Sequence, residues 1–225
     1  MVFNCDRKSE PEILFGVRLK IYTLLPESGL WVRALVTQLK FKAGHLFTDM
    51  RLSLANYSED VPQEHLCNII AYSEAFSDAT RLACNEAFSD HWGTRPWSAQ
   101  SWQDDVTDVP EFLPELSFLL VSPETSEVIA FVLCSLTGGN TEVHCRPKCY
   151  IDLAGTLPAL RGKGLATALL IHTLNTAAGQ GYDEAALMVD SDGGYDALRL
   201  YRRLGFTTIS QSTSYTLDIP APGDF

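Results

Sequence analysis

The chain has 225 residues, 46% of them hydrophobic and 20% charged, which is typical of a globular protein able to bury a full core. Its formal net charge of −11 argues against general nucleic-acid binding, because such binding needs a basic surface. No apolar run approaches the ~18 residues of a membrane-spanning helix, and the first residues lack the apolar core of a secretory signal. We therefore expect a cytoplasmic protein that binds neither membranes nor nucleic acids.

The N-terminal quarter alternates between strand and helix patterns. Residues 1–16 are polar and predicted to be disordered or irregular. Val17 to Leu25 reads as a strand, Leu30 to Leu39 carries the apolar stripe of a helix, and Gly44 to Leu54 returns to strand character. Residues 55–65, polar and interrupted by a proline, are the expected linker.

The rest of the chain predicts a mixed α/β fold. One helix begins near an N-cap at Ser77 or Asp78 and ends near Phe88, and residues 220–225 form a tail. The other expected elements are strands at 66–71, 116–122, 128–136, 149–156 and 185–190, and helices at 98–106 and 162–178. This order implies a mixed central sheet with helices on both faces.

A basic, glycine-rich turn follows the expected central strand. The run Arg161-Gly-Lys-Gly164 stands where backbone N–H groups at a helix N-terminus are free to hold an anion. Glycines let a phosphate approach the backbone closely, and the cations add charge beside the helix dipole. Residues 146–163 carry four basic residues against one acidic residue, so the turn lies in a basic stretch of an acidic chain. The pattern predicts a phosphate-bearing ligand.

Spacing excludes two common phosphate loops. A Walker loop needs Ser or Thr after its Gly-Lys pair, but Gly164 follows Lys163. A dinucleotide fingerprint needs a third glycine at the position of Thr167. What fits is Arg-x-x-Gly-x-Ala beginning at Arg161, with Pro158 three residues ahead.

A second motif, Ala197-Leu-Arg-Leu-Tyr-Arg-Arg-Leu-Gly-Phe206, follows one helix and one strand later. The two motifs resemble the acyl-CoA pyrophosphate loop and the A-x-x-L-Y-x-x-x-G-F signature of the GNAT superfamily of N-acetyltransferases. The resemblance implies a complete GNAT acyl-CoA N-acyltransferase fold over residues 66–219. Residues 17–54 resemble the C-terminal half of a degenerate GNAT repeat, as in tandem proteins of the mycothiol-synthase type, and an unrelated N-terminal extension is the alternative.

The resemblance implies acetyl-CoA as co-substrate. The end of the central strand would pair with the pantetheine arm and polarise the thioester carbonyl, and the turn would hold the pyrophosphate mainly through backbone N–H groups. The implied cofactor-binding residues are Ala154, Gly155, Thr156, Arg161, Gly162, Lys163, Gly164, Leu165, Ala166, Thr167, Gly194, Ala197 and Tyr201. The alternative is that Gly155 marks a bulge or tight packing and that Arg161 is a solvated charge.

Acetyl transfer from a thioester to an amine needs a proton acceptor for the amine and a proton donor for the departing thiolate. Tyr201 matches the family tyrosine that lies near the CoA sulfur as general acid. An unperturbed phenol, with a pKa of about 10, is able to donate at neutral pH. The alternative is that Tyr201 only packs in the apolar stripe of its helix.

Asp152 is the positional candidate for the general base. Strand alternation places it opposite Ile151 and Leu153, facing the cleft. Glu142 and His144 are the other candidates, and a water relay is common in the family. The alternative role of Asp152 is a structural one, as an anchor for the loop that follows the first helix of the complete domain.

The acceptor side is expected to include His91, Trp92 and Asp152, because the segment around His91 resembles the loop that lies over the acceptor in tandem-type GNATs. An acidic cluster after the second helix suggests a cationic amine, and a solvated acidic loop is the alternative. The members of this cluster are Asp104, Asp105, Asp108, Glu111 and Glu115.

These features predict an N-acetyltransferase that moves an acetyl group from acetyl-CoA to the primary amine of a small molecule, as a monomer or homodimer. The alternatives are a protein or peptide N-acetyltransferase and a non-catalytic acyl-CoA-binding module. The second alternative is suggested by Gly194 and its neighbours, which stand where relatives carry an Asn that contacts the cofactor. The six cysteines, Cys145 and Cys149 among them, are scattered, so we expect reduced thiols and no metal.

Overall fold

The computed structural model describes residues 19–62, 68–137, 148–193 and 197–219, and its elements lie close to the predicted ranges. The strands are β1 (Leu19–Pro26), β2 (Lys42–Ser53), β3 (Ile69–Ala71), β4 (Phe118–Val121), β5 (Val128–Thr137), β6 (Lys148–Thr156), β7 (Glu184–Asp190) and β8 (Thr207–Ile219). The α-helices are α1 (Leu30–Gln38), α3 (Ser77–Ala87), α4 (Ala99–Trp102), α5 (Leu165–Gly179) and α6 (Ala197–Arg203). In these described segments, no helix is both long enough and apolar enough to cross a membrane.

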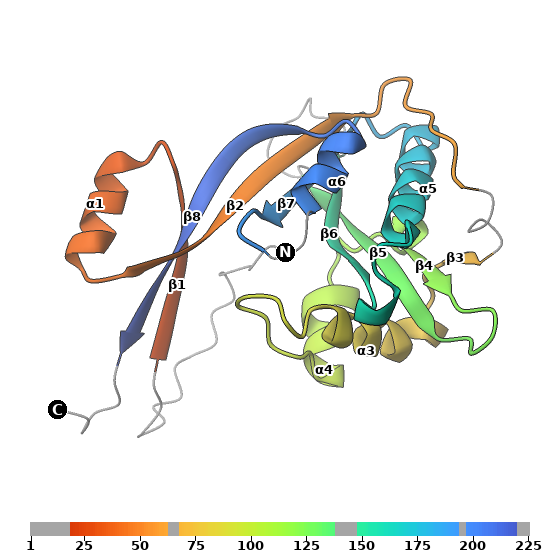
Figure 1. Ribbon diagram of the computed structural model, residues 1–225, viewed down its shortest axis with the longest axis horizontal. Coiled ribbons are helices and arrows are strands. Elements are labelled where there is room, and N and C mark those ends of the chain that lie inside the picture. The colour runs from red at the N-terminus through yellow and green to blue at the C-terminus, as the bar shows by residue number, and fades with distance from the viewer. Residues whose placement is uncertain (1–18, 63–67, 138–147, 194–196, 220–225) are drawn as a thin grey trace.

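All of these strands belong to one sheet, in the order β1-β8-β2-β7-β6-β5-β4-β3 (Figure 1). The recorded pairs of neighbouring strands are antiparallel, except for β6 and β7, which are parallel. The sheet is therefore mixed, as predicted.

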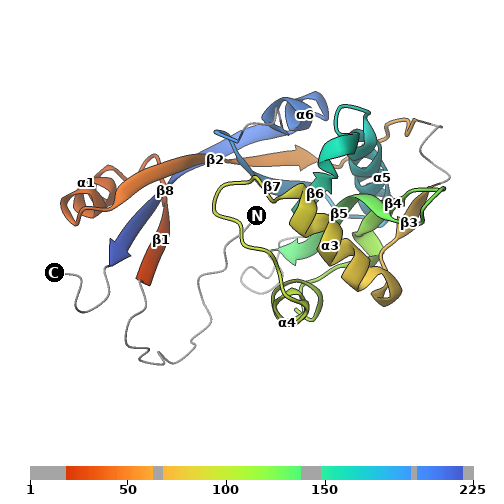
Figure 2. The same cartoon turned by 60° about the horizontal axis from the view of Figure 1, so that its bottom comes forward.

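Helices cover both faces of the sheet (Figure 1, Figure 2), and the buried residues form one core cluster on each face. α5 and α6 lie over one cluster, which includes Met50, Ile151 and Leu187 and is called here the α5 core cluster. α3 packs against β5 and β6 on the other face, over the α3 core cluster, which includes Trp102 and Phe131. The fold is the layered α/β arrangement that the order of elements predicted.

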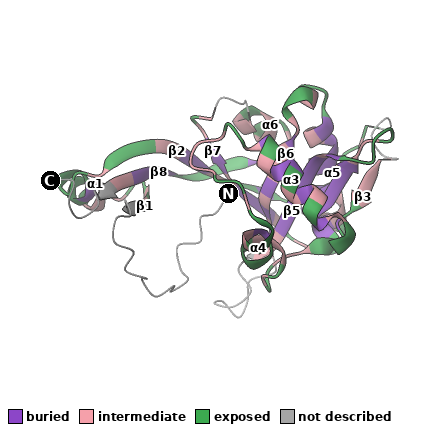
Figure 3. Ribbon diagram, turned by 90° about the horizontal axis from the view of Figure 1, so that it is seen from below, coloured by how far each residue is buried: buried purple, intermediate pink, exposed green. Residues whose placement is uncertain are grey.

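An arm extends from this body, formed by β1, α1 and the adjoining ends of β2 and β8 (Figure 1). β2 runs through both regions: its first residues are exposed, whereas Phe47, Met50 and Leu52 are buried in the body (Figure 3). The expected linker after β2 does not divide the sheet, because β2 lies between β7 and β8. Whether residues 17–54 are a degenerate repeat stays a prediction.

Two helix starts differ from the predictions. Ser77 does not cap α3; its hydroxyl accepts a hydrogen bond from Trp102 Nε1 at 3.2 Å, which satisfies a buried indole N–H. α5 begins at Leu165 and not at residue 162, because Gly162 and Gly164 have φ values of 76° and 80°, outside the right-handed helical region.

Candidate active site

β6 and β7 separate partway along the sheet. Their parallel pairing ends at Tyr150 and Ala186, while β6 continues to pair with β5 as far as Thr156. From Ile151 onward, the described segments provide no recorded strand partner for the edge of β6 that faces β7. Such an edge offers backbone N–H and C=O groups to an extended ligand, which is able to pair with it as a strand would.

A β-bulge lies at Asp152, immediately after the point of separation. In the β5–β6 ladder Leu133 pairs with Leu153 and Cys134 pairs with Ile151, so Asp152 is the extra residue on β6. The predicted alternation is therefore wrong at this point. Ile151 packs in the α5 core cluster and Leu153 in the α3 core cluster, on opposite faces of the sheet.

Burial changes the acidity of two side chains at this bulge. It raises the pKa of the Asp152 carboxyl to about 6, while a hydrogen bond with Ser135 acts in the opposite direction. Burial also raises the pKa of Tyr150, and the charges of Asp152 and Asp49 add to that rise. A carboxyl group that titrates near pH 6 is mostly ionised at neutral pH and well placed in energy to exchange a proton there.

A cavity of about 390 Å³ opens beside Tyr150, with walls from β2, β6, β7 and β8. Its polar lining includes Asp49, Arg51, Lys148 and Ser210, and Asp49 Oδ2 accepts a hydrogen bond of 2.5 Å from the Ser210 hydroxyl. This volume and this lining suit a small polar molecule.

Ala154, Gly155 and Thr156 form the end of β6. A Cβ at Gly155 would lie 2.5 Å from Phe131 Cζ, so the close packing that the sequence left open as an alternative does occur. Thr156 is buried, and its hydroxyl has no hydrogen-bond partner among the described residues. An unpaired buried hydroxyl is destabilising unless a ligand or water meets it. The end of β6 therefore holds a polar atom available to a ligand.

The predicted phosphate loop joins β6 to α5. Gly164 occupies the N-cap of α5 without a side-chain cap, and Ala168 N donates to Gly164 O. Within the described residues, no acceptor is recorded for the backbone N–H groups of residues 162–167. The glycines and Lys163 are exposed, while Leu165 is buried in the α5 core cluster and anchors the loop. This arrangement leaves several amides without a recorded acceptor at the start of a helix, where an anion is favoured.

The side chain of Arg161 holds the loop against α3. Its guanidinium donates to the carbonyl oxygens of Ala87 at 2.7 Å and Thr156 at 3.3 Å, and it lies 3.6 Å from the carboxylate of Asp90. Arg161 is therefore not a freely solvated charge, and its contacts position the loop backbone.

Tyr201 lies on α6 and packs, with Ala154 and Ala197, against the α5 core cluster. Its ring meets Phe206 edge to face at 5.7 Å. Burial raises the pKa of Tyr201 to about 12, so the phenol keeps its proton at physiological pH. A cavity of about 190 Å³ between α5 and α6 borders Thr167, on the same side of the sheet.

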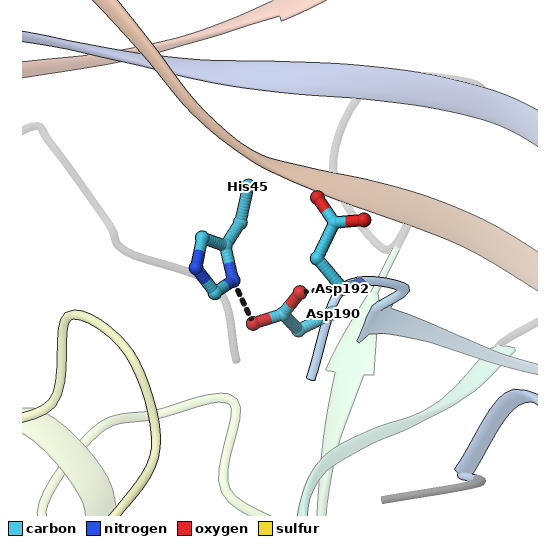
Figure 4. Close-up of side chains that lie close together, drawn as sticks. All are labelled: His45, Asp190 and Asp192. Atoms are coloured by element: carbon cyan, nitrogen blue, oxygen red, sulfur yellow. Dashed lines mark hydrogen bonds and ion pairs between the residues drawn. The ribbon is translucent and has the colours of Figure 1, made fainter. Parts of the chain in front are cut away.

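The structure also brings together side chains that sequence reasoning did not connect (Figure 4). His45 Nδ1, from β2, lies 2.7 Å from Asp190 Oδ2 at the end of β7, and His91 Nε2 lies 3.9 Å from the same oxygen. Trp92 stacks on His45 with ring centroids 4.6 Å apart. The carboxylate beside the predicted acceptor-side residues His91 and Trp92 is thus Asp190.

Sequence offered a signal for Asp190 but none for His45. Asp190 closes a predicted strand, and ligands in open α/β sheets bind beyond the carboxyl ends of strands. His45 lies 145 residues away in the chain and reaches Asp190 only because β2 lies beside β7. Asp192 lies beside this pair. One potential ligand atom from each of His45, Asp190 and Asp192 lies within 4.8 Å of the others, so the three side chains form a candidate metal site.

The remaining sequence candidates are either exposed or not described. Gly194, Glu142, His144, Cys145 and the tails at 1–16 and 220–225 lie outside the described residues. Asp104, Asp105, Asp108, Glu111 and Glu115 are all exposed. A role for this acidic cluster in acceptor binding stays a prediction.

The family model described as "Acetyltransferase (GNAT) family" matches residues 78–206, from α3 to the residue before β8. The chain therefore belongs to this acetyltransferase (GNAT) family. The fold and both sequence motifs that pointed to the family lie within or around this match.

Known proteins resemble the chain at low identity. A mycothiol acetyltransferase from Mycobacteroides abscessus is 32% identical over 139 residues, which are 62% of this chain and 44% of that protein. A mycothiol acetyltransferase from Renibacterium salmoninarum is 27% identical over 192 residues, 81% of this chain and 53% of that protein. The chain thus spans about half the length of these curated relatives. The structure of a GCN5-related N-acetyltransferase from Sphaerobacter thermophilus aligns with a TM-score of 0.71 and 21% identity, over 93% of this chain and 63% of that one, and shows the same fold.

Proposed function

We propose that the chain transfers an acetyl group from acetyl-CoA to the primary amine of a small molecule, by direct attack of the amine on the thioester. The observation that carries this proposal is the separation of β6 from β7 beside the exposed amides of residues 162–167. A free strand edge and an amide-lined helix start are what the two polar parts of acetyl-CoA, its amide-bearing arm and its pyrophosphate, require.

The residues present fit this co-substrate. The free edge of β6 would pair with the arm, the unpaired Thr156 hydroxyl offers an additional polar contact, and the N–H groups at Gly162 and Gly164 would hold the pyrophosphate. A cavity between α5 and α6 borders Thr167, in the first turn of the same helix. Acetyl-CoA supplies the activated acyl group, and the protein supplies position and proton transfer.

Tyr201 is proposed as the general acid. Its raised pKa keeps the phenol protonated, so it is able to give its proton to a departing thiolate. Asp152 is proposed to lie on the acceptor side of the reaction, where its carboxyl, with a pKa raised to about 6, would attract a cationic amine or take part in removing its proton.

A small acceptor is favoured by the cavity beside Tyr150, which is about 390 Å³ and carries Asp49, Arg51 and Lys148 in a partly apolar lining. The curated relatives are named for mycothiol, itself a small molecule, which supports the same class of acceptor. A protein or peptide acceptor would need an extended groove, and no observation favours one over this cavity.

The test combines ligand binding with an acceptor screen. Thermal unfolding is measured with acetyl-CoA, CoA and NAD. We expect acetyl-CoA and CoA to raise the unfolding temperature, because a ligand at one hundred times its Kd adds about 2.7 kcal/mol to the free energy of unfolding. Thiol release is then followed with small primary amines and with peptides. No change in unfolding temperature with acetyl-CoA or CoA would refute the proposal. Thiol release with peptides but not with small amines would show that the acceptor is a peptide.

Replacement of Tyr201 by Phe tests the general acid. We expect Tyr201→Phe to lower kcat by about 10²-fold, because the thiolate loses its proton donor, with little change in acetyl-CoA affinity. Tyr72→Phe is the matched control, since Tyr72 lies beside Phe112 at the far edge of the sheet. An unchanged kcat in Tyr201→Phe would reduce this tyrosine to a packing role.

A further inference from the structure

The carboxylate of Asp190 is buried and held at both oxygens. Its side chain is only 2% exposed, Oδ1 accepts a hydrogen bond from Asp192 N at 2.9 Å, and Oδ2 lies 2.7 Å from His45 Nδ1. A buried carboxylate with this set of contacts has one orientation, and it orients the imidazole beside it.

The pairing determines the tautomer of His45. An ionised carboxylate only accepts hydrogen bonds, so the proton of neutral His45 lies on Nδ1. Nε2 then carries the lone pair, and Figure 4 shows this second ring nitrogen directed away from both Asp190 and Asp192. Nε2 of His45 is therefore able to accept a proton, because neither Asp190 nor Asp192 contacts it.

A β-bulge places His45 in this position. On β2, Ala43 pairs with Tyr215 and Leu46 pairs with Thr213, so Gly44 and His45 lie opposite a single residue of β8. Bulges redirect side chains and occur often beside active sites. A Cβ at Gly44 would lie 3.0 Å from Trp92 Cζ2, so the glycine lets Trp92 approach and stack on His45.

The pair lies at the end of β7 that has separated from β6. β7 pairs with β6 only as far as Ala186, and Asp190 closes the separated part of β7. On its other side Asp190 pairs with Phe47 of β2, whose ring lies 6.3 Å from Trp92. His45 therefore comes from a strand outside the family match at 78–206 and completes the site at the separated end of β7.

We propose that His45 is the general base for the acceptor amine and that Asp190 is its positioning residue. This inference rests on the proposed function. Nε2 of His45 takes one proton from the ammonium group, directly or through a water; the amine nitrogen forms its bond to the acyl carbon as the C–S bond breaks. The sulfur takes a proton from Tyr201, which recovers one from the nitrogen, and His45 releases its proton to solvent. The products are the amide, the free thiol and one proton.

There are two rival explanations for this arrangement of side chains. In the first, Asp152 alone is the general base and His45 only packs against Trp92. In the second, the side chains bind a metal ion. A metal held by His45, Asp190 and Asp192 would occupy the imidazole nitrogen that faces Asp190. The experiments below separate these cases.

The first experiment uses His45→Asn, whose side-chain amide still donates to Asp190 but has no second ring nitrogen. We expect kcat to fall by about 10²-fold or more, with the stabilisation by acetyl-CoA unchanged. His172→Asn is the matched control, because His172 lies on α5 with its ring against Phe118. Imidazole added to His45→Ala should restore part of the activity, which a purely structural role would not allow.

The second experiment needs no co-substrate. ¹⁵N NMR of protein labelled in the imidazole nitrogens should show His45 with its proton on Nδ1, and Asp190→Asn should remove that preference. Wild-type kcat in His45→Asn, no rescue by imidazole, or a stoichiometric metal required for activity would each overturn the proposal. Failure of the proposed function itself is recognised separately, because the wild-type protein would then show neither stabilisation by acetyl-CoA nor thiol release.

Discussion

Two strand–helix–strand units of this molecule have the same order of elements and different surroundings. In β7–α6–β8, the apolar side of α6 packs through Leu198 and Tyr201 against the α5 core cluster. In β1–α1–β2, the helix leaves Leu30 73% and Trp31 76% exposed, although its pattern is also amphipathic. An apolar stripe thus predicts a helix without determining what will cover it.

The strands of the two units behave differently from their helices. β8 lies between β1 and β2, and β2 lies between β8 and β7, so the last strand of each unit lies beside the first strand of the other. The arm therefore contributes to the body through β2 while α1 stays outside the core. We propose that this arrangement reflects the degenerate repeat predicted for residues 17–54.

The largest loss of stability should come from a substitution in β2, where this strand passes from the arm into the core. Met50 of β2 is fully buried in the α5 core cluster, so Met50→Ala should lower the free energy of unfolding by about 2–5 kcal/mol. Urea unfolding followed by circular dichroism measures this. Met188→Ala on the paired strand is the matched control, with a smaller loss because Met188 is partly exposed. Equal losses would show that the burial of Met50 adds no stability beyond that of a partly exposed methionine.

A smaller effect, dependent on pH, should come from the bulge in the body. Because burial raises the Asp152 pKa from 3.8 to about 6, the folded chain resists ionisation of this carboxyl. The protonated Asp152 carboxyl therefore contributes to the free energy of unfolding below pH 3.8, and this contribution is lost as pH rises through 6. Asp152→Asn should therefore gain stability relative to the wild type between pH 5 and pH 8, by about 1–3 kcal/mol.

Urea unfolding at several pH values measures this difference. Asp104→Asn is the matched control, because Asp104 is exposed and its charge stays hydrated in the folded chain. A gain that does not change with pH would show that ionisation of Asp152 is not the cause.

The smallest effect should come from the exposed side of the arm. Trp31→Ala should change the free energy of unfolding by no more than about 0.5 kcal/mol, because the ring buries little surface. Val36→Ala, at the buried residue of α1, is the matched control and should cost more. A loss above about 1 kcal/mol in Trp31→Ala would show that this side of α1 is covered in solution.

Local patterns predicted most of the fold. Periodicity identified the strands and helices, and the glycines at positions 162 and 164 predicted the turn, because left-handed backbone conformations favour glycine. The start of α3 was misjudged, since the burial of Trp102 decided the role of Ser77. No local pattern distinguishes a capping serine from one that meets a buried indole.

The sequence by itself determined the class of protein, the amide-lined loop and the position of Tyr201 on its helix, because each depends on residues close together in the chain. Only the tertiary structure decided which strands are neighbours and where a ladder contains an extra residue. Those two features place Asp152 at a bulge and bring His45 to Asp190 across 145 residues. Strand pairing and register depend on packing of the whole sheet, and for that reason they cannot be read from any one segment.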